Sequence, residues 1–404
     1  MRFILVTVLI DMVAVGLIIP VLPALVGSFT QSQADTAFWF GAVSLAFGVA
    51  NFFGAPILGA LSDRYGRRPV LLIGFSGLAV SFFTTALTTS LWVLILIRLL
   101  SGGFMANAAV ANAYVADITP PAERARRFGL LGAMFGLGFI LGPVIGGLLG
   151  NIDLHLPFFV AGSLALLNLA YGYFVLPESL AVDRRTPFAW RKANPVAALK
   201  GLAELKGIGS LIVVLALSGL AQLLLHSTWV LYTTFKFGWG PLQNGWSLFA
   251  VGVMSTLVQG FLLKHLLQRF SAQRLVVMGL VSSSLCYLAW GLAPQGWVMI
   301  VVVGFNVLGF AVTAAMQSIV SNAADEATQG RTLGAVASLH SLMAVVAPVI
   351  GAALLGFVSH LPQGDWRIGA PYYFCAALQA VAMLLALRHF ARQQALKPLL
   401  SVPS

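Results

Sequence analysis

The chain has 404 residues, of which 59% are hydrophobic and only 9% are charged, and its mean hydropathy is +0.93. Soluble domains carry about 25% charged residues, so this composition excludes a soluble protein and indicates an integral membrane protein. The net charge of +11 lies in short segments between apolar runs, where basic residues orient a chain in the membrane rather than bind nucleic acid.

Twelve apolar runs are long enough to cross a bilayer as helices, since about 20 residues suffice. The predicted spans are 3–27, 36–61, 70–89, 91–116, 124–150, 155–176, 208–235, 242–267, 273–292, 296–322, 331–358 and 368–390. We therefore predict an all-α membrane protein with one six-helix bundle at 1–176 and another at 208–390. A charged linker at 177–207 joins them, and a tail at 391–404 follows.

Basic residues are concentrated in alternate connections between the spans. With the amino terminus in the cytoplasm, the inner segments hold 20 of the 23 Lys and Arg residues. The outer segments hold only Lys236 and Arg367. Because basic loops stay on the cytoplasmic side, we expect both termini to be cytoplasmic.

The two halves align when the chain is shifted by 205 residues. The shift places Arg64-Tyr65 on Arg269-Phe270, Trp92-Val93 on Trp297-Val298, Arg126 on Arg331, and Pro143-Val-Ile-Gly146 on Pro348-Val-Ile-Gly351. One offset across several loops and a helix interior predicts two parallel repeats, an arrangement found in one large transporter class. The charged residues Asp11, Asp63, Arg67 and Arg98 fall on Ala216, Gln268, Ala272 and Val303. The first repeat therefore carries the charges.

A compact charged cluster occupies the connection between the second and third spans. It reads Gly59-Ala-Leu-Ser-Asp63-Arg64-Tyr-Gly66-Arg67-Arg68-Pro69. Gly66 suits a tight turn, and Pro69 suits the first turn of the next helix. An anchor of topology would need basic charge alone, so Asp63 indicates a further role.

The fifth span contains a run of small residues, Gly138, Gly142, Gly146 and Gly147, with Pro143 among them. Small residues four apart allow two helices to approach closely, and a proline adds a kink. The run is either a static packing surface or a seam that opens and closes between the halves.

Asp11 is the only acid deep within a predicted span, and Arg98 is the only base there. Low dielectric disfavours an ionised carboxylate, so Asp11 can take up and release a proton; the alternative is a structural hydrogen bond. Arg98 stays charged and needs acceptors such as Asp11, a carbonyl or water. It either tunes a proton site or braces two helices.

Polar and aromatic residues within the spans are candidates for lining a substrate cavity. They are Asn51, Asn107, Asn112, Gln222, His226, Trp229, Tyr232, Asn306, Gln317 and His340. Gln222, His226 and Trp229 share one helical face. For each residue, a hydrogen bond between helices is the alternative.

The sequence contains no metal-spaced cluster and no Gly-rich phosphate loop with a lysine. Paired catalytic carboxylates are also absent. We therefore expect no enzyme activity, no cofactor and no ATP coupling within this chain.

These motifs resemble the major facilitator superfamily, and within it the tetracycline/proton antiporter branch of the drug exporters. The matching segments are Gly59–Arg68 in the loop between helices 2 and 3, Arg98 with Gly102 in helix 4, Gly138–Gly147 in helix 5, Asp11 with Gly16, Pro20 and Pro23 in helix 1, and Leu176-Pro-Glu-Ser179 after helix 6.

The resemblance implies a secondary transporter that works as a monomer in a bacterial inner membrane. It would exchange protons for a lipophilic drug-like molecule by alternating access, as in multidrug efflux and antibiotic resistance, with the proton gradient as its energy source. A proton-coupled nutrient importer on the same fold and a transporter-like sensor without turnover are the alternatives.

The resemblance also implies a conformational latch. Its residues would be Gly59, Asp63, Arg64, Gly66, Arg67, Arg68 and Asp117. Asp117 would pair with Arg67 to lock the outward-facing state, and Asp63 would lie at the amino end of helix 11. The chain departs from the tetracycline exporters in helices 3 and 9, where Ser76–Phe83 and Gly279–Tyr287 contain no acid.

Overall fold

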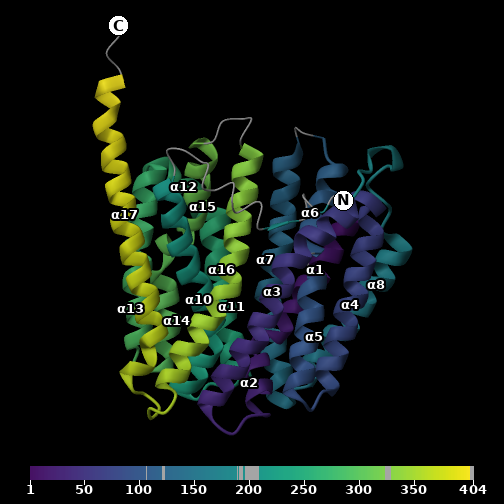
Figure 1. The fold of residues 1–404 in the computed structure, drawn as a ribbon. Coiled ribbons are helices and arrows are strands. Elements are labelled where there is room, and N and C mark those ends of the chain that lie inside the picture. The colour runs from purple at the N-terminus through teal and green to yellow at the C-terminus, as the bar shows by residue number, and fades with distance from the viewer. Residues whose placement is uncertain are drawn as a thin grey trace. The chain divides into compact units, whose positions relative to one another are not determined.

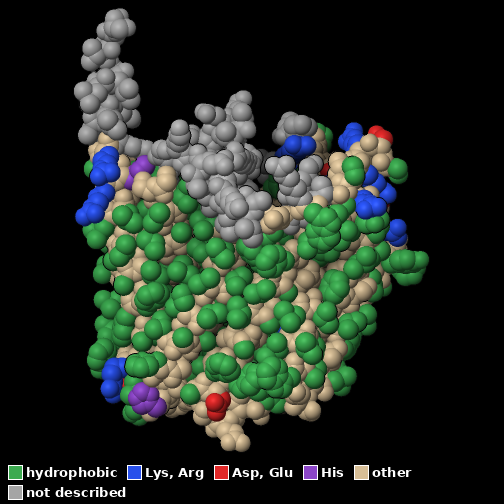
Figure 2. Space-filling view, in the orientation of Figure 1, with side chains coloured by type: hydrophobic (Ala, Val, Ile, Leu, Met, Phe, Trp, Pro, Cys, Tyr) green, Lys and Arg blue, Asp and Glu red, His purple; other side chains and the backbone are tan. Residues whose placement is uncertain are grey.

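The computed structural model describes the chain except residues 106, 121–122, 189, 191–193, 196–208, 324–328 and 401–404. Within the described residues the structure consists of helices and short connections, without strands. Large apolar side chains point outward, and Phe174 is 81% exposed while Phe357 is 80% exposed. Figure 2 shows hydrophobic side chains along the lengths of the helices and Lys and Arg near their ends, as a lipid environment requires.

Eleven described helices are long and apolar enough to cross a membrane, and a bent pair of helices supplies a twelfth crossing. The bent pair is Gly296–Phe305 (α14) with Val307–Val320 of α15, at an angle of 49°. The prediction of twelve helical spans is confirmed, with a break at Asn306 in the tenth.

The fourth span comprises α5 (Leu91–Phe104) and α6 (Asn107–Asp117), with residue 106 outside the described residues. The chain leaves helical geometry at Met105, whose N–H bonds to the carbonyl of Gly102 instead of the residue four back. The helix therefore tightens locally at Met105.

Contacts divide the chain into two compact units. The first unit is Met1–Pro195 with Thr233–Gly252, and the second is Val196–Tyr232 with Val253–Ser404. Part of the predicted linker, 196–207, lies outside the described residues. The described part of the predicted tail continues as helix to Leu400.

The first unit is built on α1, which packs against α7 and α8, while α3 packs on α5 and α4 on α8 (Figure 1). The helices just named span Arg2–Ile18 (α1), Gln33–Tyr65 (α3), Arg67–Leu87 (α4), Arg124–Ile152 (α7) and Leu156–Val175 (α8). The unit also contains α2 (Leu22–Gly27), the 3-10 turn η2 (Val182–Arg184) and α11 (Pro241–Leu257) as far as Gly252. Leu71, Phe75 and Tyr114 are among its most buried side chains.

The second unit is centred on α13, which packs against α15 and α17. Its elements are α10 (Gly209–Phe237) as far as Tyr232, η3 (Val258–Leu262), α12 (Leu263–Arg269), α13 (Ala272–Leu292), α14, α15 (Val307–Ala323), α16 (Gln329–Val358), η4 (Trp366–Gly369) and α17 (Ala370–Leu400). A core of aliphatic side chains from α10, α13, α15 and α17 holds these helices together.

The second span of each repeat is irregular at a corresponding place. In the first repeat, Pro56 lies inside α3 and removes a helical hydrogen bond. In the second, the shift of 205 residues places Pro56 on Phe261, within the π-helical turn η3. The repeat is therefore preserved in the irregularity as well as in the regular helices.

Candidate functional site

The turn between α3 and α4 depends on a glycine. Gly66 has φ +105°, which side-chain-bearing residues rarely adopt. A Cβ at this position would also collide with the carboxyl of Glu178. The absence of a side chain at residue 66 thus lets α4 begin directly after α3 and lets Glu178 approach its first turn.

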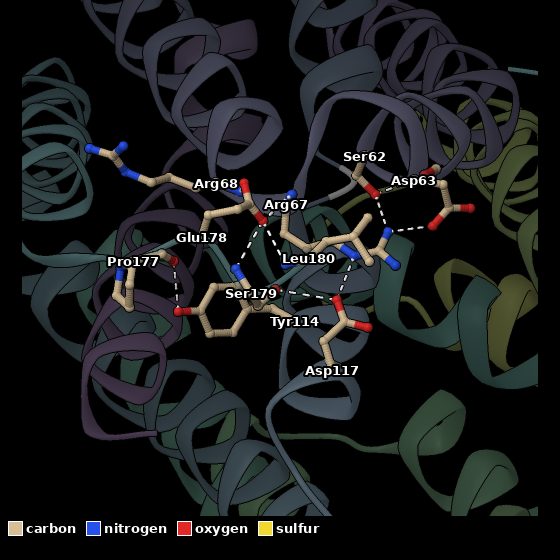
Figure 3. Close-up of polar contacts among 11 residues, drawn as sticks. Ser62, Asp63, Arg67, Arg68, Tyr114, Asp117, Pro177, Glu178, Ser179 and Leu180 are labelled. Carbon is tan, nitrogen blue, oxygen red and sulfur yellow. Dashed lines mark hydrogen bonds and ion pairs between the residues drawn. The ribbon is translucent and has the colours of Figure 1, made fainter. Parts of the chain in front are cut away.

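Arg67, the first residue of α4, is the centre of a polar network (Figure 3). Its Nε donates to Asp117 Oδ2 at 2.9 Å. Its Nη1 donates to Asp63 Oδ1 at 2.5 Å and to Ser62 Oγ at 2.7 Å. The Arg67 side chain is 9% exposed, so water screens its attraction to Asp117 less than it would screen a surface ion pair.

The carboxyl of Glu178 caps the amino end of α4. Its two oxygens accept the backbone N–H groups of Arg67 at 2.9 Å and Arg68 at 3.2 Å. Oε1 also accepts the N–H groups of Ser179 and Leu180, each at 2.9 Å. A negative charge satisfies the free N–H groups of a helix amino end and is favoured by its dipole.

The segment Pro177–Thr186, which we call the strap, is tied to the same network. Tyr114 Oη donates to the carbonyl of Pro177 at 2.9 Å, and Ser179 Oγ donates to Asp117 Oδ2 at 3.2 Å. The N–H of Thr186 donates to the carbonyl of Asp63 at 3.1 Å. The start of the predicted linker is therefore fixed on the first unit.

Sequence reasoning matched Glu178 to a family segment but assigned it no role. The signal available was an acid directly after the sixth span, in a chain with only 12 acids. Its partner could not be named, because the contact joins residues 111 positions apart.

Three other predicted latch residues contribute no side chain to the contacts of Arg67. Arg64 is exposed, with its guanidinium 5.0 Å from the ring centroid of Tyr65. Arg68 Nη2 donates to the carbonyl of Tyr173 at 2.5 Å. A Cβ at Gly59 would meet open space. The placement of Asp63 at the amino end of the eleventh span and the latch function stay predictions.

Asp11 lies within α1 with 5% of its surface exposed. It lines a small cavity together with Thr7 and Asn107 and otherwise apolar side chains. Arg98 is 4% exposed, and its Nε and Nη2 have no hydrogen-bond partner among the described residues. Among the described contacts none joins Arg98 to Asp11, so the suggested pairing of these two residues stays a prediction.

The glycine run of α7 makes close contact mainly with α1. A Cβ at Gly138 would collide with Met12, one at Gly142 with Gly16, and one at Gly146 with Leu17. Three of the four glycines thus set the approach of α1 to α7. Gly147 instead faces Gly245 of α11, and Pro143 lies inside α7.

In the second unit, polar candidates on neighbouring helices come together. Thr313 Oγ1 of α15 donates to Gln222 Oε1 of α10 at 3.3 Å. His226 of α10 and His340 of α16 have exposed side chains and lie close enough to interact electrostatically. Gln317 of α15 is also exposed. These side chains present polar groups at membrane depth.

Trp229 and Tyr232, two further cavity candidates, pack in the core instead. Trp229 is 3% exposed and Tyr232 is fully buried. The Trp229 ring meets Trp290 edge to face at 5.2 Å, and Tyr232 Oη donates to the Trp290 carbonyl at 2.7 Å. Neighbouring aromatic rings cover both side chains, and their position on a cavity wall stays a prediction.

The remaining candidates occupy varied environments. Asn51 is half-buried, and Asn112 is exposed with its Nδ2 donating to the carbonyl of Ala108 at 2.8 Å. Asn306 is 4% exposed and ends α14 at the bend. Asn107 is equally buried and lies beside Asp11 in the cavity of the first unit.

Twelve helical crossings in two repeats, with buried charges inside the first, define a transporter rather than an enzyme. A family model for the Major Facilitator Superfamily matches residues 4–348 and also residues 211–401. The chain belongs to the major facilitator superfamily, and its architecture fits that fold.

Tetracycline resistance proteins are similar to this chain over most of its length. The class C protein of Escherichia coli is 36% identical over 368 residues, covering 91% of this chain and 92% of that protein. The class D protein of Salmonella ordonez is 33% identical over 382 residues, covering 94% of this chain and 95% of that protein.

Solved structures share the fold at lower identity. The human organic anion transporter MFSD10 (TETRAN) matches with a TM-score of 0.70 and 23% identity, over 95% of this chain and 98% of that chain. The nucleoside transporter NupG matches with a TM-score of 0.77 and 14% identity, over 96% of this chain and 98% of that chain.

Proposed function

We propose that the protein exports a lipophilic drug-like molecule in exchange for protons across a bacterial inner membrane, with both termini in the cytoplasm. The observation that carries the proposal is the buried carboxyl of Asp11 within a membrane-spanning helix. The names of the tetracycline resistance proteins support export of a drug. No ligand besides the substrate and the proton is required.

Asp11 is suited to coupling because its two protonation states differ strongly in cost. An ionised carboxylate is expensive in low dielectric, whereas the neutral acid is tolerated. In the proposed cycle Asp11 takes a proton from outside, the protein changes its facing, and substrate arrival from inside accompanies release of that proton. The loaded protein then reopens outward.

The network around Arg67 would act as the latch of this cycle. An arginine bound to two carboxylates at the end of a span stabilises one arrangement and must be broken to reach another. The pair Arg67–Asp117 at 2.9 Å is the contact whose making and breaking we assign to the latch.

The residues within the spans indicate which class of substrate the protein binds. Within Ser76–Phe83 and Gly279–Tyr287 there is no acid, so a site for a compact cation is not favoured there. Apolar surface with a few hydrogen-bonding groups suits a flat, lipophilic molecule. Tetracyclines are the first compounds to test, within a broader drug-susceptibility panel in an exporter-deficient host.

The decisive experiment compares the wild type with Asp11→Asn in proteoliposomes under an imposed proton gradient. We expect the variant to lose at least tenfold of its proton-driven efflux while it still binds substrate and exchanges it across the membrane without a gradient. Asp35→Asn is the matched control, because Asp35 is exposed at the start of α3 and accepts only from Ser32.

Three outcomes contradict the proposal. Normal gradient-driven efflux by Asp11→Asn would remove the coupling role. Proton-driven accumulation of substrate by cells would indicate an importer. Ligand binding without any flux in the wild type would indicate a sensor.

A further inference from the structure

Three polar side chains gather in the first unit at the depth of the bilayer interior. Thr7 and Asp11 lie one turn apart on α1, and Asn107 lies on α6 in the fourth span. Their exposed fractions are 1%, 5% and 4%. All three line one cavity, which has room for about one water molecule.

Two of these side chains carry buried polar atoms that lack a well-formed hydrogen bond. Among the described residues, Thr7 Oγ1 and Asn107 Nδ2 have no partner at good hydrogen-bond geometry, although the Asn107 amide lies close enough to Asp11 to act on its carboxyl. Native proteins rarely leave such groups unsatisfied, since each costs free energy in an apolar surrounding. The amide oxygen of Asn107 faces Gly74 of α4, where a Cβ would collide with it. The amide nitrogen is the end available to the Asp11 carboxyl and to a water beside it.

The rest of the cavity wall is apolar. It is formed by α1, α4, α6 and α7, and its remaining residues are Val8, Met12, Leu71, Phe75, Ala108, Ala111 and Phe135. Asp11 is the only titratable side chain in this wall, and Arg98 is not part of it. A proton that binds here therefore has one carboxyl as its acceptor.

The second repeat shows that the fold does not require these polar groups. The shift of 205 residues places Thr7, Asp11 and Asn107 on Ile212, Ala216 and Val312. The packing at this place is otherwise kept, since Gly74 falls on Gly279, and a Cβ at Gly279 would collide with Val312. In the second unit Ile212 and Val312 belong to the hydrophobic core.

We infer that Thr7 and Asn107 complete, around Asp11, a binding site for one water molecule that serves the proton-coupling carboxyl. The site rests on the proposed function for its role in transport. When Asp11 is ionised, the water donates to the carboxylate and accepts from Asn107 Nδ2 and the Thr7 hydroxyl. When a hydronium delivers its proton, the carboxylate becomes a carboxylic acid whose O–H donates to the water that remains, and the Thr7 hydroxyl turns to accept from that water.

Asn107 is then a positioning residue that favours the ionised form of Asp11. Its N–H group donates to the water, which keeps the water's own O–H groups directed at Asp11, and donors to a carboxyl favour its ionised form. The Asn107→Val variant copies the residue that the second repeat uses at this place, so the packing is expected to tolerate it. Thr7→Val removes the hydroxyl with almost no change in shape.

The test is infrared difference spectroscopy on purified full-length protein across a range of pH. The carbonyl stretch of protonated Asp11 is assigned by its loss in Asp11→Asn. We expect Asn107→Val to bind the proton at least tenfold more tightly than the wild type, and Thr7→Val to shift in the same direction by less. Asn112→Val is the control on the same helix, because Asn112 is exposed and bonded to its own helix; it should titrate as the wild type does.

The water has its own readout in the same spectra. A bound-water O–H band that moves in ¹⁸O-labelled water should appear when wild-type Asp11 changes protonation and be lost in Asn107→Val. Unchanged proton affinity in both Asn107→Val and Thr7→Val, or no such water band in the wild type, would overturn the inference. If Asp11→Asn still abolishes coupled efflux in that case, the proposed function stands and only the water site fails.

Discussion

The two copies of the turn between the second and third spans begin the next helix in different ways. In the second unit, Ser271 caps α13 locally, with its hydroxyl oxygen accepting the N–H of Arg274 at 3.3 Å. In the first unit the corresponding residue is Gly66, which has no side chain to offer. The cap of α4 comes instead from Glu178, beyond the sixth span.

This difference shows where the repeat has specialised. A local serine cap is sufficient to start a helix, so the second copy contains what the fold requires. The first copy replaces that local cap with a distant carboxyl and adds Arg67 where the second has Ala272. The additions connect the turn to α6 and to the strap, as a device that senses movement of several helices would need.

The sharpest test of the specialised turn removes its central ion pair. Arg67→Ala should lower the free energy of unfolding by about 3 kcal/mol, since it leaves Asp117 without its cation, and should reduce efflux at least tenfold. Asp117→Ala should do the same, and the double variant should be little worse than either, because one interaction is lost in each case.

The control for this cycle is an exposed pair of the same unit. Arg127 and Glu123 are 35% and 51% exposed and lie 3.0 Å apart. Arg127→Ala should lower the free energy of unfolding by less than about 0.5 kcal/mol. Additive losses for Arg67 and Asp117, in stability and in efflux, would show that they do not act as one contact.

A second test adds a methyl group at the turn. Gly66→Ala should cost roughly 2 kcal/mol, because the backbone has a positive φ and the new Cβ meets Glu178. Thermal unfolding in detergent measures the loss. Gly59→Ala is the matched control, since its Cβ meets open space within α3 and should leave stability unchanged or slightly raised. Equal effects of the two substitutions would contradict the assigned role of Gly66.

The smallest expected effects compare the two caps directly. Ser271→Ala should cost about 1 kcal/mol of stability and leave efflux unchanged, as expected of an ordinary helix cap. Glu178→Ala should cost a similar amount, about 1 kcal/mol, but should also reduce efflux severalfold because the cap is tied to the Arg67 network. If efflux responds equally to both substitutions, the distinction between the two turns is lost.

Much of the architecture followed from hydropathy and repetition. Spans of about 20 apolar residues can be recognised directly in the sequence, and the constant offset identified the repeat. The contact between Arg67 and Asp117 was expected from the family resemblance, and the structure contains it. The Arg67→Ala and Asp117→Ala variants test its role in gating.

Other features depend on contacts that local patterns do not encode. The cap by Glu178 joins residues 111 positions apart. The approach of Asn107 to Asp11 joins α6 to α1, two helices about a hundred residues apart in the chain. Trp229 shares a helical face with His226, yet its burial is decided by Trp290, a residue of another helix. Periodicity gives a face but not the neighbour that covers it.

The distant cap has a consequence for biosynthesis. A ribosome releases Arg67 and the first turn of α4 long before it reaches Glu178, so the nascent third span enters the membrane with its first N–H groups facing water. The turn acquires its final hydrogen bonds only after three more spans have been inserted and Pro177–Thr186 has emerged. Closure of the strap would thus mark completion of the first repeat, at a stage when most of the second is still to be made.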